Sequence, residues 1–264
     1  DETPVSLKNP KWAEPASFAM SYLMGGKPKY GTIDPSIIWA ISYPLIFGMI
    51  VGDIGYGLVM LAIILWMRLK FKDKPAVQLA TGLLGPAATA AILFGFFYGE
   101  FFGAVFWEAG WIRTFELLGF TLPYNREHVV QPLMFMALGL GVIQILFGLI
   151  LGVVNSVRTK HMKHAFVKGG LAGFIVGAII LVIAMVLLNS NPVVQIIGAI
   201  TMTVGILAVL RWGGIMGFVE TLESISNIAS YIRIMAVGLS DAIFATAINR
   251  MAANDQIPTV VGIV

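Results

Sequence analysis

The sequence contains no cysteine, and charged residues make up only 12% of its 264 positions. Without cysteine the chain can form neither a disulfide nor a metal site with thiolate ligands. Hydrophobic residues account for 58% of the chain, and its mean hydropathy is +0.87. Such a composition excludes a soluble domain of the ordinary kind. We therefore expect a protein that crosses a lipid bilayer several times.

The excess of basic residues is small, with a net charge of +3 and an isoelectric point near 9.1. These residues cluster beside apolar segments, where they set the orientation of a membrane protein, so nucleic acid is not an expected partner. The three histidines fall in expected loops, and no metal-ligand spacing emerges. The stretch "GDIGYG" lacks the preceding strand and the following Lys-Ser/Thr of a phosphate-binding loop. We expect neither a metal ion nor a cofactor.

The expected fold is all-α, a polytopic bundle of about seven transmembrane helices. A helix needs about 20 residues to cross a hydrocarbon core of roughly 30 Å. Residues 1–35 are expected to be an irregular cytoplasmic or interfacial lead-in, and residues 36–264 a transmembrane domain. The expected segments are about 37–52, 54–67, 79–107, 129–154, 169–188, 193–210 and 215–248.

Loop charges divide the first apolar run, 37–67, into two segments. The loops around 68–74 and 158–168 are strongly basic and are placed in the cytoplasm, whereas the mixed-charge stretch 108–128 is placed outside. If the lead-in is also cytoplasmic, the first run must enter the membrane and return, turning near Asp53. The final residues, "IPTVVGIV", resemble the start of another apolar segment. We therefore expect the chain to be a fragment with at least one further span to follow.

The seventh segment carries an arginine, Arg233, where a bilayer is driest. Arginine is effectively never deprotonated, and a charge at mid-bilayer costs roughly 2.5–3.5 kcal/mol on insertion scales. With about 100° between successive residues of a helix, a polar stripe runs along the face that contains this arginine. The other members of the stripe are Glu223, Ser226, Ser230, Ser240 and Asp241.

The two acids of this stripe stand on either side of Arg233. Glu223 lies roughly 15 Å away toward the expected cytoplasmic side, and Asp241 roughly 12 Å away toward the outside. A salt bridge within the helix needs a spacing of three or four residues, so neither acid can pair directly with the arginine. Pairing with another helix remains one explanation. The other is an ion pathway, in which Arg233 lowers the pKa of any carboxyl group that approaches it.

Other polar residues of the segments have weaker claims to that pathway. Asp53 is either a turn aspartate bonded to nearby backbone or an acid that lines an aqueous cavity. Glu100, in "FGFFYGEFFG", has the same two interpretations, and the structural one is favoured. Glu220, Asn227 and Ser240 are further candidates on the seventh segment. Glycines four residues apart recur in several segments and predict close helix packing.

The stretch "SNIASYIRIMAVGLSDA" resembles the penultimate span of the a subunit of rotary V/A-type ATPases, called subunit I in prokaryotes. In that family a Ser-Tyr-x-Arg pattern carries the essential arginine, and Arg233 matches it. Four further stretches match in the family's order, and the resemblance covers nearly the whole chain. They are "KPKYGTIDPS" followed by "PLIFGMIVGDIGYG", then "FGFFYGEFFG", then "FGLILGVVNSVRTKHMKHA".

The resemblance implies a non-catalytic stator in a prokaryotic plasma membrane. Its long, tilted seventh helix faces a rotating ring of small subunits of the c, K or proteolipid type, each with a carboxylate. Glu223 and Ser226 match the cytoplasmic half-channel, Arg233 the barrier, and Asp241 and Asp53 the outer half-channel. The translocated ion is expected to be a proton, with Na⁺ left open.

The same resemblance implies further partners and missing parts. Peripheral-stalk and central-stalk subunits of the ATPase are expected partners, whereas the family's N-terminal cytoplasmic arm and final span are absent from this sequence. A secondary ion-coupled transporter with a mid-membrane site is the rival function. Such transporters have matching broken helices in two halves, and no second half of this sequence mirrors the first. An inert anchor would leave the Arg233 stripe unexplained.

Overall fold

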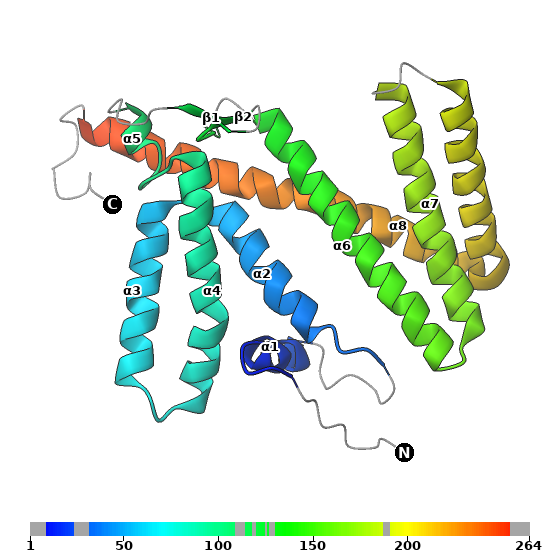
Figure 1. Cartoon of the computed structure of the whole chain (residues 1–264), viewed down its shortest axis with the longest axis horizontal. Helices are drawn as coiled ribbons and strands as arrows, with labels where there is room; N and C mark the ends of the chain where they lie inside the picture. Colours follow the sequence, from blue (N-terminus) through cyan, green and yellow to red (C-terminus); the bar gives the residue numbers. More distant parts are fainter. Residues whose placement is uncertain are drawn as a thin grey trace. The chain divides into compact units, whose positions relative to one another are not determined.

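A computed structural model of the chain describes residues 9–23, 32–108, 114–117, 120–124, 126, 130–186 and 191–253. Most of these residues are helical (Figure 1). Four helices among these described residues are long and apolar enough to cross a membrane. The expected all-α fold class is confirmed, and the chain is a multi-pass integral membrane protein. A small antiparallel hairpin that the sequence did not indicate joins β1 (Phe115–Leu117) to β2 (Phe120–Leu122).

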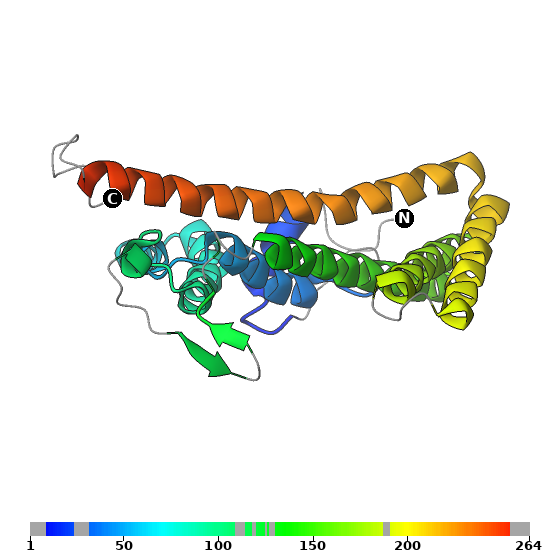
Figure 2. The ribbon, with the colours of Figure 1, turned by 90° about the horizontal axis from the view of Figure 1, so that it is seen from above.

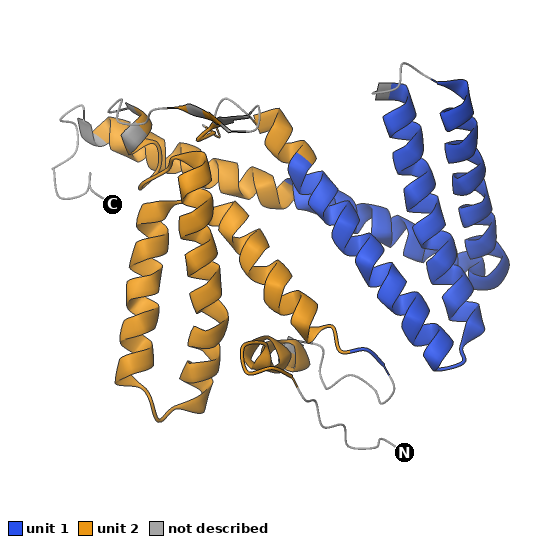
Figure 3. Cartoon of the chain, in the orientation of Figure 1, with its two compact units in different colours: residues 1–3, 28–33, 136–232 blue, residues 4–27, 34–135, 233–264 orange. Residues whose placement is uncertain are grey.

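The chain forms two compact units, coloured separately in Figure 3. Unit 1 comprises residues 1–3, 28–33 and 136–232, and unit 2 comprises residues 4–27, 34–135 and 233–264. Unit 1 contains most of α6 (Val130–Arg158), all of α7 (Met162–Val186) and the first part of α8 (Pro192–Ala253). The helices within residues 14–23 and 36–108, the β hairpin and the end of α8 belong to unit 2.

A helical hairpin in unit 2 turns at Asp53. Helix α2 (Ser36–Val51) ends at Gly52, and α3 (Ile54–Lys70) begins after Asp53, so the turn falls where the loop charges predict it. Helix α4 (Pro75–Tyr98) packs against both. A Cβ atom on Gly48 would lie 2.6 Å from the carbonyl carbon of Ala90, so the two helices touch through backbone. The predicted role of the glycine spacing in close packing holds here.

The end of α4 differs from the expected segment 79–107. The helix ends at Tyr98 because Gly99 adopts φ = 66°, a left-handed conformation that glycine enters without steric cost and that stops a helix. A loop follows, and then the single-turn helix α5 (Val105–Glu108). The aromatic-rich stretch "FGFFYGEFFG" remains apolar past this point, and hydropathy alone does not mark a C-cap. The end of the helix could therefore not be predicted from hydropathy.

The lead-in also differs from the irregular structure expected. Helix α1 (Glu14–Leu23) occupies part of it and is viewed nearly along its axis in Figure 1. Proline is tolerated in the first turn of a helix, where the amide groups have no partner within the helix, so Pro15 does not prevent its formation. Ala13 and Ala16 are buried, and α1 packs against α2 and α4. The expected irregular lead-in is therefore helical over these residues.

In unit 1, α7 and the beginning of α8 approach each other through glycines. A Cβ atom on Gly177 would lie 2.4 Å from the backbone nitrogen of Met202, and one on Gly205 would lie 2.5 Å from that of Phe174. Close approach of this kind is typical of small residues in membrane helices. A cluster of Val167, Leu171, Val209 and Leu149 continues the contact.

The seven expected segments correspond to six helices of the described residues, because α8 contains two of them. Helical geometry fails inside α8 at Gly214 (φ = 59°, ψ = −143°), and Figure 2 shows the change of direction there. Residues 215–253 then continue as one helix. Helices α2 and α3 have only 16 and 17 residues, shorter than the roughly 20 needed for a full crossing, and therefore do not count among the four long apolar helices.

Candidate functional site

Arg233 lies on the face of α8 that points away from the packing of unit 2. The buried residues of this part of the helix recur every three or four positions, as expected for one packed face. They are Met235, Gly238, Ala242, Ala245 and Thr246. At about 100° per residue, all lie roughly 120–220° around the helix from Arg233. The side chain of Arg233 is consequently exposed.

Most of the predicted companions of Arg233 are also exposed on α8. In unit 2, Ser240 and Asp241 are exposed. In the part of α8 that belongs to unit 1, Glu223, Ser226 and Asn227 are exposed, whereas Ser230 and Glu220 are half-buried. Across the described ranges, no hydrogen bond or ion pair joins Arg233 to another residue. Among the described residues, the cation of Arg233 therefore has no internal partner.

The carboxylate of Asp53 is part of a tight backbone junction. It caps α3 by accepting a hydrogen bond of 3.0 Å from the amide of Tyr56. It also accepts bonds from the amides of Phe102 (3.0 Å) and Gly103 (2.7 Å). Asp53 as a whole is only 2% exposed. These contacts match the turn interpretation of Asp53, extended to a loop about 50 residues further along the chain.

Glu100 forms a buried ion pair with Arg126. The Nε of Arg126 donates a bond of 2.7 Å to one oxygen of Glu100, and Nη2 contacts the other oxygen. The remaining donors reach the carbonyl oxygens of Ile50 (3.0 Å) and Val51 (3.1 Å), while the guanidinium lies 4.7 Å from the ring centroid of Tyr98. Burial acts to lower the pKa of Arg126, but the hydrogen bond and charge of Glu100 outweigh it and raise that pKa.

Arg126 is the residue that sequence reasoning missed. It was counted only as part of the mixed charge of an outer loop, yet it is 1% exposed. The available signal was Glu100, because an acid inside an aromatic, apolar stretch requires a partner. The structure thus brings Asp53, Glu100 and Arg126 together around the end of α2. It does not bring Arg233 into that group.

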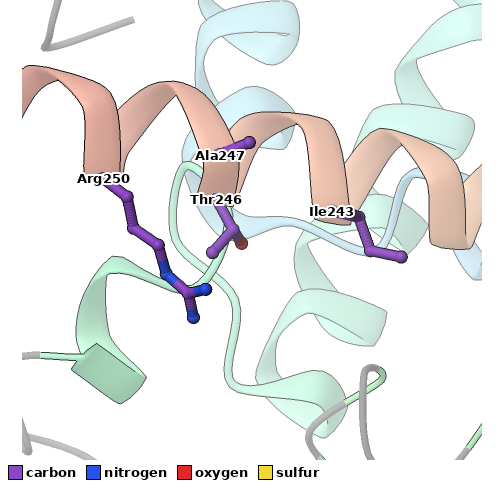
Figure 4. A pocket seen from close by; sticks show the side chains of 4 residues that line it. All are labelled: Ile243, Thr246, Ala247 and Arg250. Atoms are coloured by element: carbon purple, nitrogen blue, oxygen red, sulfur yellow. The ribbon is translucent and has the colours of Figure 1, made fainter.

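A separate cavity of about 440 Å³ lies along the end of α8 in unit 2. Its lining consists of Ile243, Thr246, Ala247 and Arg250, and Figure 4 shows Thr246 and Arg250 on the same side of the helix. The hydroxyl of Thr246 is used within the helix, where it donates to the carbonyl of Ala242. The lining has no acid, and no cluster of three potential metal ligands occurs among the residues that the structure describes.

Several curated relatives of this chain are each named as subunit I of an ATP synthase. No protein-family model matches the chain. The A-type ATP synthase subunit I of Archaeoglobus fulgidus is 33% identical over 182 residues, which cover 63% of the chain and 26% of that protein. The A-type ATP synthase subunit I of Methanothermobacter thermautotrophicus is 28% identical over 276 residues, covering 100% of the chain and 38% of that protein.

A bacterial relative belongs to the same group. The V-type ATP synthase subunit I of Borreliella burgdorferi is 28% identical over 246 residues, covering 85% of the chain and 40% of that protein. The chain therefore spans between 26% and 40% of the length of these three relatives. The similarity extends through the helices described above, including α8 with Arg233 in the matches that cover the whole chain.

Proposed function

The chain belongs to the family of subunit I of A-type and V-type ATP synthases, and we propose that it is the ion-translocating stator of a rotary ATPase. In this proposal the Arg233 face of α8 lies against a ring of small membrane subunits, each with a carboxylate. Arg233 separates two half-channels for the ion. The chain itself carries no catalytic chemistry and couples ion movement to ATP hydrolysis or synthesis elsewhere in the complex.

The observation that carries the proposal is the exposure of Arg233 on the unpacked face of α8. A permanent cation in a membrane helix is costly, and the described residues give it no counter-charge. A partner that brings a carboxylate to this face would supply one. The cation would in turn lower the pKa of that carboxyl group and release its proton.

The neighbouring polar residues fit the two half-channels. Glu223 and Ser226, both exposed, are proposed to line the cytoplasmic one, and Ser230 continues the stripe toward Arg233. Asp241, exposed on the other side of Arg233, is proposed to line the outer one. Asp53 is left out of this path, because three backbone amides already occupy its carboxylate.

Cross-linking in the assembled complex tests the proposal. A cysteine at Ser240, on the Arg233 face, is expected to form disulfides with cysteines introduced beside the ring carboxylate. A cysteine at Ala242, on the packed face of the same helix, serves as the control and is expected to form none. A complex that purifies in mild detergent without any ring subunit would refute the proposal and favour the secondary transporter.

A further inference from the structure

We propose that Arg126 and Asp53 build a two-point seat that fixes the rotation of the end of α8 about its own axis, and so fixes the direction of Arg233. The seat is defined as the carbonyl of Ile50 together with the backbone of Phe102 and Gly103. All of its contacts lie within unit 2. Only the functional importance of the direction of Arg233 rests on the function proposed above.

The first point of the seat is the end of α2, which Arg126 holds. The last carbonyl groups of a helix have no partner within the helix, and those of Ile50 and Val51 accept bonds from the two terminal nitrogens of Arg126. Helix α8 rests directly on this backbone. A Cβ atom on Gly238 would lie 2.5 Å from the oxygen of Ile50 and 3.2 Å from its Cα.

The second point of the seat is the loop after α4, which Asp53 holds. The carboxylate of Asp53 accepts bonds from the amides of Phe102 and Gly103. This loop also contacts α8. A Cβ atom on Gly103 would lie 2.9 Å from the Cβ of Ala245, and the side-chain amide of Asn249 donates a bond of 2.7 Å to the carbonyl of Phe102.

The two points contact the same face of α8 at different heights. Gly238, Ala245 and Asn249 lie about 140°, 120° and 160° around the helix from Arg233. Between Gly238 and Asn249 the helix rises by roughly 16 Å. Two contacts so far apart on one face resist both rotation and tilting, because a turn of the helix in either direction would separate one contact or force the other into backbone atoms.

The two charged residues that hold the seat, Arg126 and Asp53, each have partners of their own. Arg126 has Glu100 as its counter-charge and uses its remaining donors on the α2 carbonyls. Asp53 has three backbone amides. A positioning role therefore accounts for both residues without requiring either to take up or release an ion. The competing account, in which Asp53 is a titrating acid of the outer half-channel, predicts a different response to substitution.

The test measures the orientation of α8 directly. The full-length subunit, in the assembled complex and reconstituted in vesicles, carries nitroxide labels at cysteines introduced at Ser240 of α8 and at Leu93 of α4, which is 57% exposed. Pulsed electron paramagnetic resonance gives the distribution of distances between the two nitroxide labels. The protein with an unsubstituted seat is expected to give a single narrow distribution of label-to-label distances. ATP-driven ion transport is recorded on the same preparations.

Three variants disturb the seat in different ways. Gly238→Ala is expected to displace the distribution, because the added methyl group would meet the backbone of Ile50. Arg126→Gln is expected to broaden it, because both α2 carbonyls lose their cation. Arg126→Lys keeps a counter-charge for Glu100 but loses the planar fork, so an intermediate distribution is expected. Gly139→Ala is the matched control, since a Cβ there would meet nothing within 4 Å.

Asp53→Asn separates the two accounts of Asp53. The amide keeps one acceptor oxygen and cannot titrate, so the seat account predicts a partly broadened distribution with transport reduced in proportion. A narrow, unchanged distribution with transport abolished would overturn the seat account of Asp53 in favour of the titrating acid.

Other outcomes decide between the inference and the proposed function. Unchanged distributions in both Gly238→Ala and Arg126→Gln would overturn the seat. If Arg126→Gln fails to assemble, Gly238→Ala and Arg126→Lys still decide the matter. Displaced distributions with undiminished transport would support the seat and refute the proposed dependence of transport on Arg233.

Discussion

The hydroxyl group of Tyr231 donates a hydrogen bond of 2.7 Å to the side-chain oxygen of Gln144, and its ring lies on Gly141. Both partners are on α6, and all three residues belong to unit 1. A Cβ atom on Gly141 would lie 2.7 Å from the ring. Tyr231 is therefore held by one polar contact and by one small residue that leaves room for it.

The contacts of Tyr231 predict unequal effects of two substitutions. Tyr231→Phe should lower the free energy of unfolding by about 0.5–1.5 kcal/mol, the net value of one hydrogen bond. Gly141→Ala should cost about 1–3 kcal/mol, because the ring must move. Denaturant unfolding of the purified subunit in detergent measures both. Combining Tyr231→Phe with Gln144→Leu should give a coupling of similar size to the bond, and additive effects would contradict the contact.

The buried pair of Glu100 and Arg126 predicts a larger loss of stability. Glu100→Gln leaves the guanidinium buried without its counter-charge, which costs about 3–5 kcal/mol. Replacing both residues together, by Met at each position, should be less harmful than Glu100→Gln alone, because no unpaired charge remains. The melting temperatures of the variant subunits in detergent show which variant is less stable. A double variant less stable than Glu100→Gln would contradict this account of the pair.

Loop charges predict the sidedness of the helices. Cysteines placed at Lys72 and Lys163 should be protected from an impermeant thiol reagent added outside intact cells, whereas a cysteine at Glu116 should react. All three side chains are exposed in the structure, so burial within the protein does not account for protection. Reaction of position 72 from outside would reverse the expected orientation of the α2 and α3 hairpin.

Much of the fold and of the candidate site could be predicted from the sequence, because the sequence patterns that indicate them are local. The turn at Asp53 followed from loop charges, and the stripe around Arg233 followed from the helical period. The pairing of Glu100 with Arg126 could not, since 26 residues separate them and no periodic pattern links them. For the same reason, the role of Gln144 beneath Tyr231 appears only when α6 and α8 are packed.

The hydrogen bonds of Asp34, in the lead-in, predict that the stability of the protein depends on pH. Burial acts to raise the pKa of Asp34, but hydrogen bonds from Ser36 and Asn9 outweigh it and lower that pKa below its ordinary value of 3.8. A depressed pKa contributes stability above the ordinary value, and this contribution is lost as the pH falls through the folded value.

Asp34→Asn should therefore reduce the loss of thermal stability between about pH 6 and pH 3, because the titrating group is gone. The melting temperature of the subunit across this range is the measurement. Asp73→Asn, in the exposed turn after α3, is the matched control and should leave the acid-induced loss as it is in the unsubstituted protein. An unchanged loss in Asp34→Asn would contradict the role given to the Ser36 and Asn9 bonds.

The most direct test concerns Arg233 in the full-length subunit, within the assembled complex in vesicles. Arg233→Gln should abolish ATP-driven acidification or Na⁺ uptake while subunit content stays normal. Arg233→Lys should fail nearly as badly, because lysine lacks the planar fork and can deprotonate when buried. Ser230→Ala, one turn away, should reduce transport only modestly, since it removes one neutral hydrogen-bonding group, worth about 0.5–1.5 kcal/mol. Coupled transport at the unsubstituted rate by Arg233→Gln would contradict the account.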